Sequence, residues 1–265
     1  MTKDEKLLIY NFLKTTSDSL YGFSSPHFPK DTPQFLDDVP AQFTENAAQN
    51  PQENFSPAYS STPESTRPQN AGASDTISNI ALKIAQCQRC PLAKMRMNTV
   101  PGEGIKNPFV LVIGEGPGEE EDRSGRPFVG PAGQLLDKML AAIGLSRTTN
   151  TFIANIVKCR PPYNRNPEPN EADSCRSFLD AQIAALKPKA ILAAGSVAIK
   201  NLLHTNEGVL RLHGKILDYN GIPLCTTYHP SALLRAPENK RVAWEDLKIF
   251  RTKLLELNPD YQNQK

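Results

Sequence analysis

Four short apolar runs alternate with amphipathic segments after residue 74, and this alternation constrains the fold more than any other feature of the sequence. The runs are FVLVIG at 109–114, TFIANIV at 151–157, AILAAG at 190–195 and IPLCTTY at 222–228. A continuous apolar run is typical of a strand that is buried on both faces of a parallel sheet. The pattern therefore predicts an α/β domain, in which a mostly parallel four-stranded central sheet lies within three αβα layers.

The segments between these runs have the apolar spacing of helices. DTISNIALKIAQC precedes the first run, AGQLLDKMLAAIGL ends at Gly144, and EADSCRSFLDAQIAALK stops before Pro188. SVAIKNLL is predicted to open on Ser196 as its N-cap, and VAWEDLKIFRTKLLEL is the closing helix. Ligands of parallel sheets bind beyond the carboxyl ends of the strands, so the site is expected in the loops that follow them.

The first part of the chain has a different composition. Residues 24–73 contain eight prolines among Ser, Thr, Gln and Asn, and their apolar residues have no period. Such a segment cannot bury enough surface to offset its ordering entropy, which predicts a disordered linker or a linker that holds a short partner-binding motif. A short N-terminal helix is expected within 1–23, so three parts are predicted: 1–23, 24–73 and a folded domain over 74–265.

Charge is distributed unevenly along the chain. The formal net charge is +2, but residues 74–265 carry 25 of the 30 bases and 19 of the 28 acids, an excess of six positive charges. This excess permits a polyanionic partner without demonstrating one. No apolar run approaches the ~18 residues that span a bilayer, and the first residues do not resemble a signal peptide. We therefore expect a cytoplasmic protein without a membrane partner, where disulfides are not the default use of cysteine.

Four of the five cysteines are candidates for one site. Cys87 and Cys90 form a C-x2-C pair, 68 residues separate Cys90 from Cys159, and 15 separate Cys159 from Cys175. Zinc accepts four thiolates, but its ribbon sites usually have two close pairs. A [4Fe–4S] cluster accepts ligands from separated segments and fits this spacing better, while buried free thiols are a third interpretation. Cys225 lies within a predicted strand and is assigned to the core.

Three of the predicted strands are followed by side chains suited to a ligand. The first loop, GEGPGEEEDRSGRPFVG, offers close backbone approach at glycine, the acid Glu115 and the ring of Phe128. Its glycines miss the dinucleotide-binding spacing, and no G-K-[ST] occurs in the chain. Asn155 ends the second strand with a donor and an acceptor side by side, and His229 follows the fourth strand. Each is compatible with an ordinary turn, but together they form a candidate pocket.

Four motifs in order resemble family 4 of the uracil-DNA glycosylase superfamily, whose members carry an iron–sulfur cluster. They are CQRCPLAK, VIGEGPGEEEDRSGRPFVGPAGQLLDKML, ANIVKCRPPYNRNPEP and TYHPSALLR, and the resemblance covers residues 77–257. It implies the fold of that superfamily for a catalytic domain at 74–265. It also implies a monomeric DNA repair enzyme that releases uracil from single- or double-stranded DNA. The [4Fe–4S] ligands would be Cys87, Cys90, Cys159 and Cys175.

The resemblance also implies roles for the pocket. Phe128 would stack on a uracil flipped out of the helix, and Asn155 would hydrogen-bond to its Watson–Crick edge. The backbone of Glu115 and Gly116 would complete the recess, with His229 beside the uracil O2 as the main donor to the departing uracil anion. Candidate catalytic residues are thus His229 and Glu115.

Two departures from related enzymes leave gaps in these roles. Other uracil-DNA glycosylases place a Tyr against the methyl group of thymine, where this chain has Gly118. Glu115 is therefore the candidate residue for excluding thymine. Family 1 enzymes activate water with an Asp where this chain has Gly116, so the group that activates water is unassigned.

DNA contacts are expected beside the pocket. Leu233 and Leu234 are placed to enter the base stack that the flipped nucleotide leaves. Phosphate contacts are expected from the segment after His229 and from the loop after the second strand. The candidates are Ser231, Arg235 and Arg160, with Arg165, Arg211, Lys215 and Arg241 as further nonspecific contacts.

Two alternatives remain open. A uracil-crosslinking protein of the same superfamily would capture the sugar with a loop histidine, for which His213 in RLHGKI is the candidate. That group carries Gln at the position of Gly116, which argues against it. A noncatalytic iron–sulfur DNA-binding module or electron carrier would need only the cysteines and the positive charge. The N-terminal helix and linker could bind a protein partner in either case.

Overall fold

The structure is a computed structural model that describes residues 7–8 and 76–263. Residues 7 and 8 are helical, and otherwise the expected N-terminal helix (1–23) and linker (24–73) lie outside the described residues. The chain divides into two units, of which Ser74–Lys265 is the second and is described below.

The centre of this unit is a six-stranded sheet with the order β1-β3-β2-β4-β6-β5. The four predicted strands are β2 (Val110–Gly114), β3 (Thr151–Asn155), β4 (Ala190–Ala194) and β6 (Ile222–Thr227). They are parallel to one another and adjacent in the sheet. Every residue of β2, β3 and β4 is buried, which explains their continuous apolar sequence. The predicted parallel core is confirmed.

Two short edge strands bring the sheet to six. β1 (Glu103–Gly104) pairs antiparallel with β3, and β5 (Ile216–Tyr219) pairs antiparallel with β6. β1 is too short to have a visible period, and most of β5 is not fully buried, so neither has the apolar signal that identified the central strands. The sheet therefore has two more strands than the sequence predicted.

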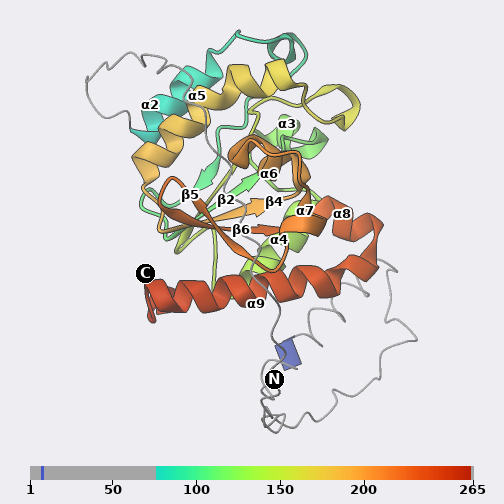
Figure 1. Cartoon of the computed structure of the whole chain (residues 1–265). Coiled ribbons are helices and arrows are strands. Elements are labelled where there is room, and N and C mark those ends of the chain that lie inside the picture. The colour runs from blue at the N-terminus through green and yellow to red at the C-terminus, as the bar shows by residue number, and fades with distance from the viewer. Residues whose placement is uncertain (1–6, 9–75, 264–265) are drawn as a thin grey trace, which may run out of the picture. The chain divides into compact units, whose positions relative to one another are not determined.

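Helices cover both faces of the sheet (Figure 1). On one face lie α2 (Ile77–Ala85), α5 (Pro169–Leu186) and α6 (Ser196–Leu203), and on the other lie α4 (Pro131–Ala141) and α9 (Lys240–Leu257). Side chains that alternate along the strands supply both layers. As predicted, Cys225 is buried in β6, where its Sγ contacts a carbonyl oxygen of α9. The three-layer αβα architecture is confirmed.

The remaining helical elements are short. They lie in the loops around the sheet, where the sequence analysis expected irregular chain. They are η1 (Pro91–Lys94), α3 (Glu119–Ser124), η2 (Pro162–Asn164), α7 (Val209–Leu212), α8 (Pro230–Arg235), η3 (Pro237–Asn239) and η4 (Tyr261–Asn263).

The start of α6 differs from the prediction. Gly195 is the N-cap and Ser196 the first helical residue, so the assignment of Ser196 as N-cap was wrong. Gly195 has a φ of +90°, and a Cβ there would lie 2.7 Å from the Cβ of His229. Glycine is therefore required at the end of β4 because the loop after β6 passes so close to it.

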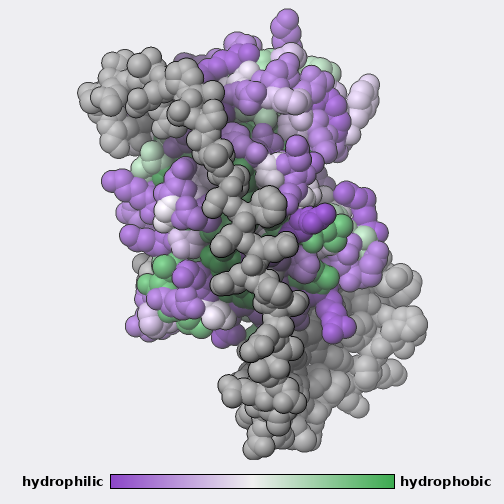
Figure 2. All heavy atoms as spheres, viewed as in Figure 1, coloured by the Kyte–Doolittle hydropathy of each residue, from purple (hydrophilic) through white to green (hydrophobic). Residues whose placement is uncertain are grey.

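None of the helices in the part of the chain that the structure describes is both long and apolar enough to cross a bilayer. On the face drawn in Figure 2, hydrophilic side chains predominate and hydrophobic ones form small separate patches.

Candidate active site

The carboxyl ends of three parallel strands open into one cavity of about 240 Å³. Glu115 and Gly116 follow β2, Asn155 ends β3, and His229 follows β6. All four line the cavity together with Phe128, which comes from the loop between α3 and α4. The structure therefore brings together the five residues that the sequence analysis selected for the pocket.

Phe128 and Asn155 are packed closely against the end of β2. A Cβ on Gly114 would lie 2.5 Å from Cζ of Phe128 and 2.6 Å from Oδ1 of Asn155, so a larger residue cannot occupy that position. The rings of Phe128 and His229 have centroids 5.5 Å apart and an interplanar angle of 35°. The aromatic ring, the carboxamide and the imidazole thus bound one small space.

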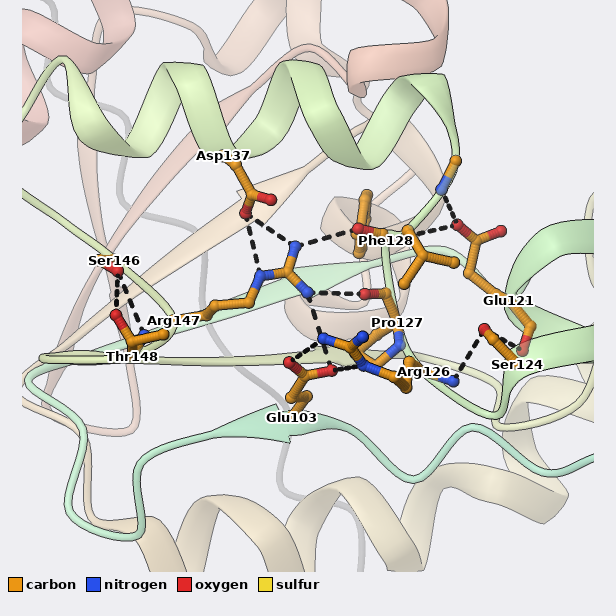
Figure 3. Close-up of polar contacts among 12 residues, drawn as sticks. Glu103, Glu121, Ser124, Arg126, Pro127, Phe128, Asp137, Ser146, Arg147 and Thr148 are labelled. Carbon is orange, nitrogen blue, oxygen red and sulfur yellow. Dashed lines mark hydrogen bonds and ion pairs between the residues drawn. The ribbon is translucent and has the colours of Figure 1, made fainter.

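Phe128 adopts an unfavourable backbone conformation that its neighbours stabilise. Its φ is +53°, in the left-handed region that bulky residues avoid. Arg147 donates hydrogen bonds to the carbonyl oxygens of Pro127 and Phe128, both at 3.0 Å, and its Nη2 lies 2.7 Å from Oδ1 of Asp137 (Figure 3). The guanidinium therefore holds the peptide groups that set the position of the ring. Arg147 was not predicted from the sequence.

Glu121 is a second supporting residue that the sequence analysis missed. Its Oε1 accepts hydrogen bonds from the backbone N–H groups of Val129 and Gly130 at 2.8 and 3.0 Å, and its Oε2 accepts one from Gly118 at 3.0 Å. One carboxylate thus ties together both sides of the loop after β2. Its place at the third position of α3 is the only local signal, because a Glu there often caps the preceding turn.

His229 is held in one tautomer. Its Nδ1 accepts a hydrogen bond from the backbone N–H of Ser231 at 3.2 Å and lies 2.8 Å from the Ser231 Oγ. An acceptor nitrogen carries no proton, so the proton of the neutral ring is on Nε2. Burial, assisted by the Arg235 charge, lowers the pKa of His229 to about 4. At neutral pH the ring is therefore an uncharged Nε2–H donor.

Two buried polar atoms of the site have no partner. Oδ1 of Asn155 and Nε2 of His229 are both buried, and neither has a hydrogen-bond partner among the described residues. An unsatisfied buried polar group costs about 1–3 kcal/mol, so two of them in one cavity indicate a missing polar ligand. That ligand must donate a hydrogen bond to Asn155 and accept one from His229.

Glu115 and Gly116 form the wall that follows β2. Burial raises the pKa of the Glu115 carboxyl, while the nearby Arg235 charge acts in the opposite direction. A Cβ on Gly116 would lie 2.7 Å from Cγ2 of Val157, so the backbone there packs directly against the segment after β3. Gly116 therefore leaves no room for a side chain that could activate water.

The segment after His229 was predicted to contact DNA. Ser231 and Arg235 line the cavity, and the Arg235 side chain has no ion pair with another described residue. Leu234 is half-buried on α8. Leu233 is fully buried, so the prediction that it enters the DNA stack was wrong: it belongs to the protein core.

The predicted basic contacts elsewhere are mostly paired or distant. Nη2 of Arg160 lies 3.1 Å from Glu119. Arg165 lines the cavity and forms a two-point ion pair with Glu171 at 2.7 and 2.8 Å. The cavity lining does not include Arg160, Arg211, Lys215, Arg241 or the crosslinking candidate His213.

The four predicted cluster cysteines line a second, smaller cavity. It lies where the end of α2, the loop after β3 and the helix α5 meet, and Nη1 of Arg96 donates to Sγ of Cys159 at 3.1 Å. Among the described residues, no three Cys, His, Asp or Glu side chains converge as a single metal ion would require. The four thiols thus line one cavity although they come from separate segments of the chain.

A buried polar chain links the two cavities. Lys158 is only 1% exposed, and its Nζ donates to the Asn155 carbonyl oxygen and to Oε1 of Gln182, both at 2.7 Å. Nε2 of Gln182 donates in turn to the Pro101 carbonyl oxygen at 2.6 Å. Lys158 lines the cysteine cavity, so the position of Asn155 depends on the segment that carries Cys159. Neither Lys158 nor Gln182 was predicted from the sequence.

The chain is similar in sequence to known proteins. The family model of the uracil DNA glycosylase superfamily matches residues 101–248. A type-4 uracil-DNA glycosylase of Pyrobaculum aerophilum is 43% identical over 178 residues, 63% of this chain and 89% of the relative. One from Thermotoga maritima is 41% identical over 172 residues, 63% and 89% of the two chains. A type-5 uracil-DNA glycosylase of Pyrobaculum aerophilum is 29% identical over 184 residues, which cover 57% of this chain and 80% of the relative.

The parallel sheet with a polar cavity at its carboxyl edge, together with this match, defines the class: the chain belongs to the uracil DNA glycosylase superfamily. Identity is higher to the type-4 relatives than to the type-5 relative. Within the superfamily the chain therefore groups with the type-4 proteins, and the resemblance found in the sequence is confirmed.

Proposed function

We propose that the protein is a DNA repair glycosylase that flips uracil out of DNA and hydrolyses its N-glycosidic bond, leaving free uracil and an abasic site. Family membership supports the activity. The observation that carries the assignment to this cavity is the pair of unpartnered buried atoms, Oδ1 of Asn155 and Nε2 of His229, beside the ring of Phe128.

Uracil supplies the hydrogen bonds that this pair lacks. Its N3–H donates to Oδ1 of Asn155, its O4 accepts from the amide of the same residue, and its O2 accepts from Nε2–H of His229. Phe128 provides the stacking surface. Cytosine reverses the pattern at N3 and position 4, so the Asn155 amide would be mispaired at a cost of about 1–3 kcal/mol for each unsatisfied group.

The reaction breaks the bond between N1 of uracil and C1′ of the sugar, and the electron pair leaves with the uracil. Negative charge grows on the base while the sugar becomes an oxocarbenium-like cation, which water then captures. A preorganised donor is most effective where charge develops, and Nε2–H of His229 has that role at O2. A neutral imidazole is sufficient. The Glu115 carboxyl is the candidate that excludes thymine at the wall of the recess.

The pH dependence tests the neutral state of His229. With a pKa of about 4 in place of the usual 6.5, the ring stays uncharged from about pH 5 upward, so the rate of the chemical step has no inflection near 6.5 from this group. At lower pH a proton on Nδ1 opposes the Ser231 N–H and the rate falls. Single-turnover rates measured across this pH range check the prediction. The same measurements with Glu115→Gln separate the titration of the Glu115 carboxyl from that of His229. An inflection near pH 6.5 that persists in that variant argues for a cationic histidine.

Four thiolates around one cavity fit a [4Fe–4S] cluster held by Cys87, Cys90, Cys159 and Cys175. Zinc ribbon sites usually have two close cysteine pairs, whereas 15 residues separate Cys159 from Cys175 here, which favours the cluster. When bound, the cluster supplies iron–thiolate ties among segments far apart in sequence. The chain's own residues carry the reaction. Burial raises the pKa of the Cys159 thiol to about 11, and the Arg96 guanidinium beside it acts in the opposite direction.

Metal content and variants test this site. Purified wild-type protein should absorb visible light and contain iron and acid-labile sulfide, whereas Cys90→Ser should lose most of the iron and unfold at a lower temperature. Cys225→Ala is the matched control, because Cys225 is buried in β6 and does not line the cysteine cavity. Stoichiometric zinc, or equal iron loss in the control, would contradict the assignment.

An assay of uracil-containing single- and double-stranded DNA tests the function directly. Chromatography should detect free uracil, and alkali should cleave the strand at the abasic site. The crosslinking alternative predicts a protein–DNA band on a denaturing gel instead; its candidate His213 is 43% exposed, lies near Asp246 and does not line the cavity. A DNA complex without either product would favour the noncatalytic binding module.

We also propose a cellular location, an oligomeric state and partners for this enzyme. A cytoplasmic enzyme is proposed, because a reducing compartment keeps the cysteines as free thiols that can ligate a cluster. A monomer is proposed from the family resemblance. Uracil-containing DNA is the proposed partner, and the segment before residue 74 is the proposed contact for any protein partner.

A further inference from the structure

Tyr163 is an aromatic side chain that the fold does not use. Its side chain is 97% exposed, more than any other large hydrophobic residue in the described part of the chain. It stands in η2, and its neighbours Pro161, Asn164 and Arg165 line the candidate active site. A nearly bare ring therefore projects from a segment in which other residues line the cavity.

The loop that presents this ring is fixed. Pro161 and Pro162 precede Tyr163, and Nε of Arg160 donates to Oδ1 of Asn164 at 2.8 Å. Flanking ion pairs join Arg160 to Glu119 at 3.1 Å and Arg165 to Glu171 at 2.7 Å. The side chain is thus held out from the surface by a braced segment.

The backbone of the loop is also strained. Tyr163 and Asn164 both have a φ of +55°, so two consecutive non-glycine residues occupy the left-handed region. Glycine would adopt this conformation at lower cost than tyrosine. Neither burial nor backbone preference accounts for an aromatic residue here. Contact with a binding partner would account for it.

We propose that Tyr163 stacks on the DNA base next to the extruded uracil. This inference rests on the proposed function. Extrusion leaves the neighbouring base with an uncovered face, and aromatic side chains bind such faces irrespective of base identity. Arg235, whose side chain has no ion pair with another described residue, lines the same cavity and offers a phosphate contact. Leu233 cannot cover the base because it is buried.

A nucleobase fits this surface better than a protein does. The residues beside Tyr163 in the sequence are mostly polar: Arg160, Asn164, Arg165 and Asn166 accompany the prolines, and the two arginines are paired with Glu119 and Glu171. Protein-binding patches are contiguous apolar areas of several hundred Å², whereas one aromatic ring among basic and amide groups is typical of single-stranded nucleic-acid contacts.

The test measures binding to a strand that contains 2′-fluoro-2′-deoxyuridine, which resists cleavage, with 2-aminopurine as the adjacent base. Wild-type protein should change the 2-aminopurine fluorescence on binding. Tyr163→Ala should bind about 5- to 100-fold more weakly and lose most of that change, while Tyr163→Phe keeps both because the ring remains. Leu257→Ala, an exposed apolar side chain at the end of α9, should behave as wild type.

Tyr163→Gly separates stacking from strain. Glycine tolerates the positive φ, so this variant should be at least as thermally stable as wild type and still bind as weakly as Tyr163→Ala. Wild-type affinity in both the Ala and Gly variants, or in Gly alone, would overturn the inference. Wild-type protein that releases no uracil would instead reject the proposed function, so the two failures are distinguishable.

Discussion

Replacing His229 by alanine should lower the single-turnover rate of uracil release by about 10²–10³, because one preorganised donor to a developing oxyanion has an effect of that size. The buried Nε2 has no protein partner among the described residues, so its hydrogen bond is available to the departing base. Substrate binding should weaken much less, since the donor acts mainly where charge develops. Rapid-quench measurement at saturating enzyme separates the two effects.

His213→Ala is the matched control for that variant. His213 is 43% exposed and does not line the cavity, so its loss should leave the rate within about twofold of wild type. A large loss of rate in His213→Ala together with a normal rate in His229→Ala would show that His213, which lies outside the cavity, carries the chemistry. That result would contradict the mechanism.

Asn155→Asp should change the base that the enzyme prefers. The carboxylate accepts hydrogen bonds but cannot donate one to uracil O4, and it can accept from the amino group of cytosine. The ratio of uracil to cytosine release should fall by at least about tenfold, since each mispaired buried group costs about 1–3 kcal/mol. Parallel assays on strands that differ only in the target base measure this ratio.

Asn201→Asp serves as the control for the amide-to-acid change, because its Nδ2 bonds to the Val197 carbonyl oxygen on α6 and it does not line the cavity. Its base preference should match that of wild type. If Asn155→Asp remains folded and its preference for uracil is undiminished, the amide does not read the base.

The parts of the site that could be predicted from sequence are those fixed by strand ends. Asn155 and His229 follow continuous apolar runs, and parallel strands bring their carboxyl ends to one edge, so local pattern and topology place them together. Phe128 was recognisable from its Pro and Gly neighbours within a motif of the superfamily.

The supporting residues could not be predicted in the same way. Arg147 acts on a carbonyl 19 positions away, and the partner of Lys158 is 24 positions away in α5, so no local period reports either contact. Leu233 was misassigned because α8 was not predicted: without the helix, the sequence does not show which of two adjacent leucines faces the core. The strands β1 and β5 were missed because β1 is very short and most of β5 is not fully buried.

The most direct measurement of the central claim is a ¹H–¹⁵N spectrum of labelled protein during titration with a noncleavable uracil-containing strand. The side-chain amide of Asn155 and the Nε2–H of His229 should both shift on saturation, because each gains its missing partner, and a strand with cytosine at the same position should move neither comparably. If both signals stay in place while the uracil strand is fully bound, or respond equally to cytosine, the recess at the sheet edge is not where the base is recognised.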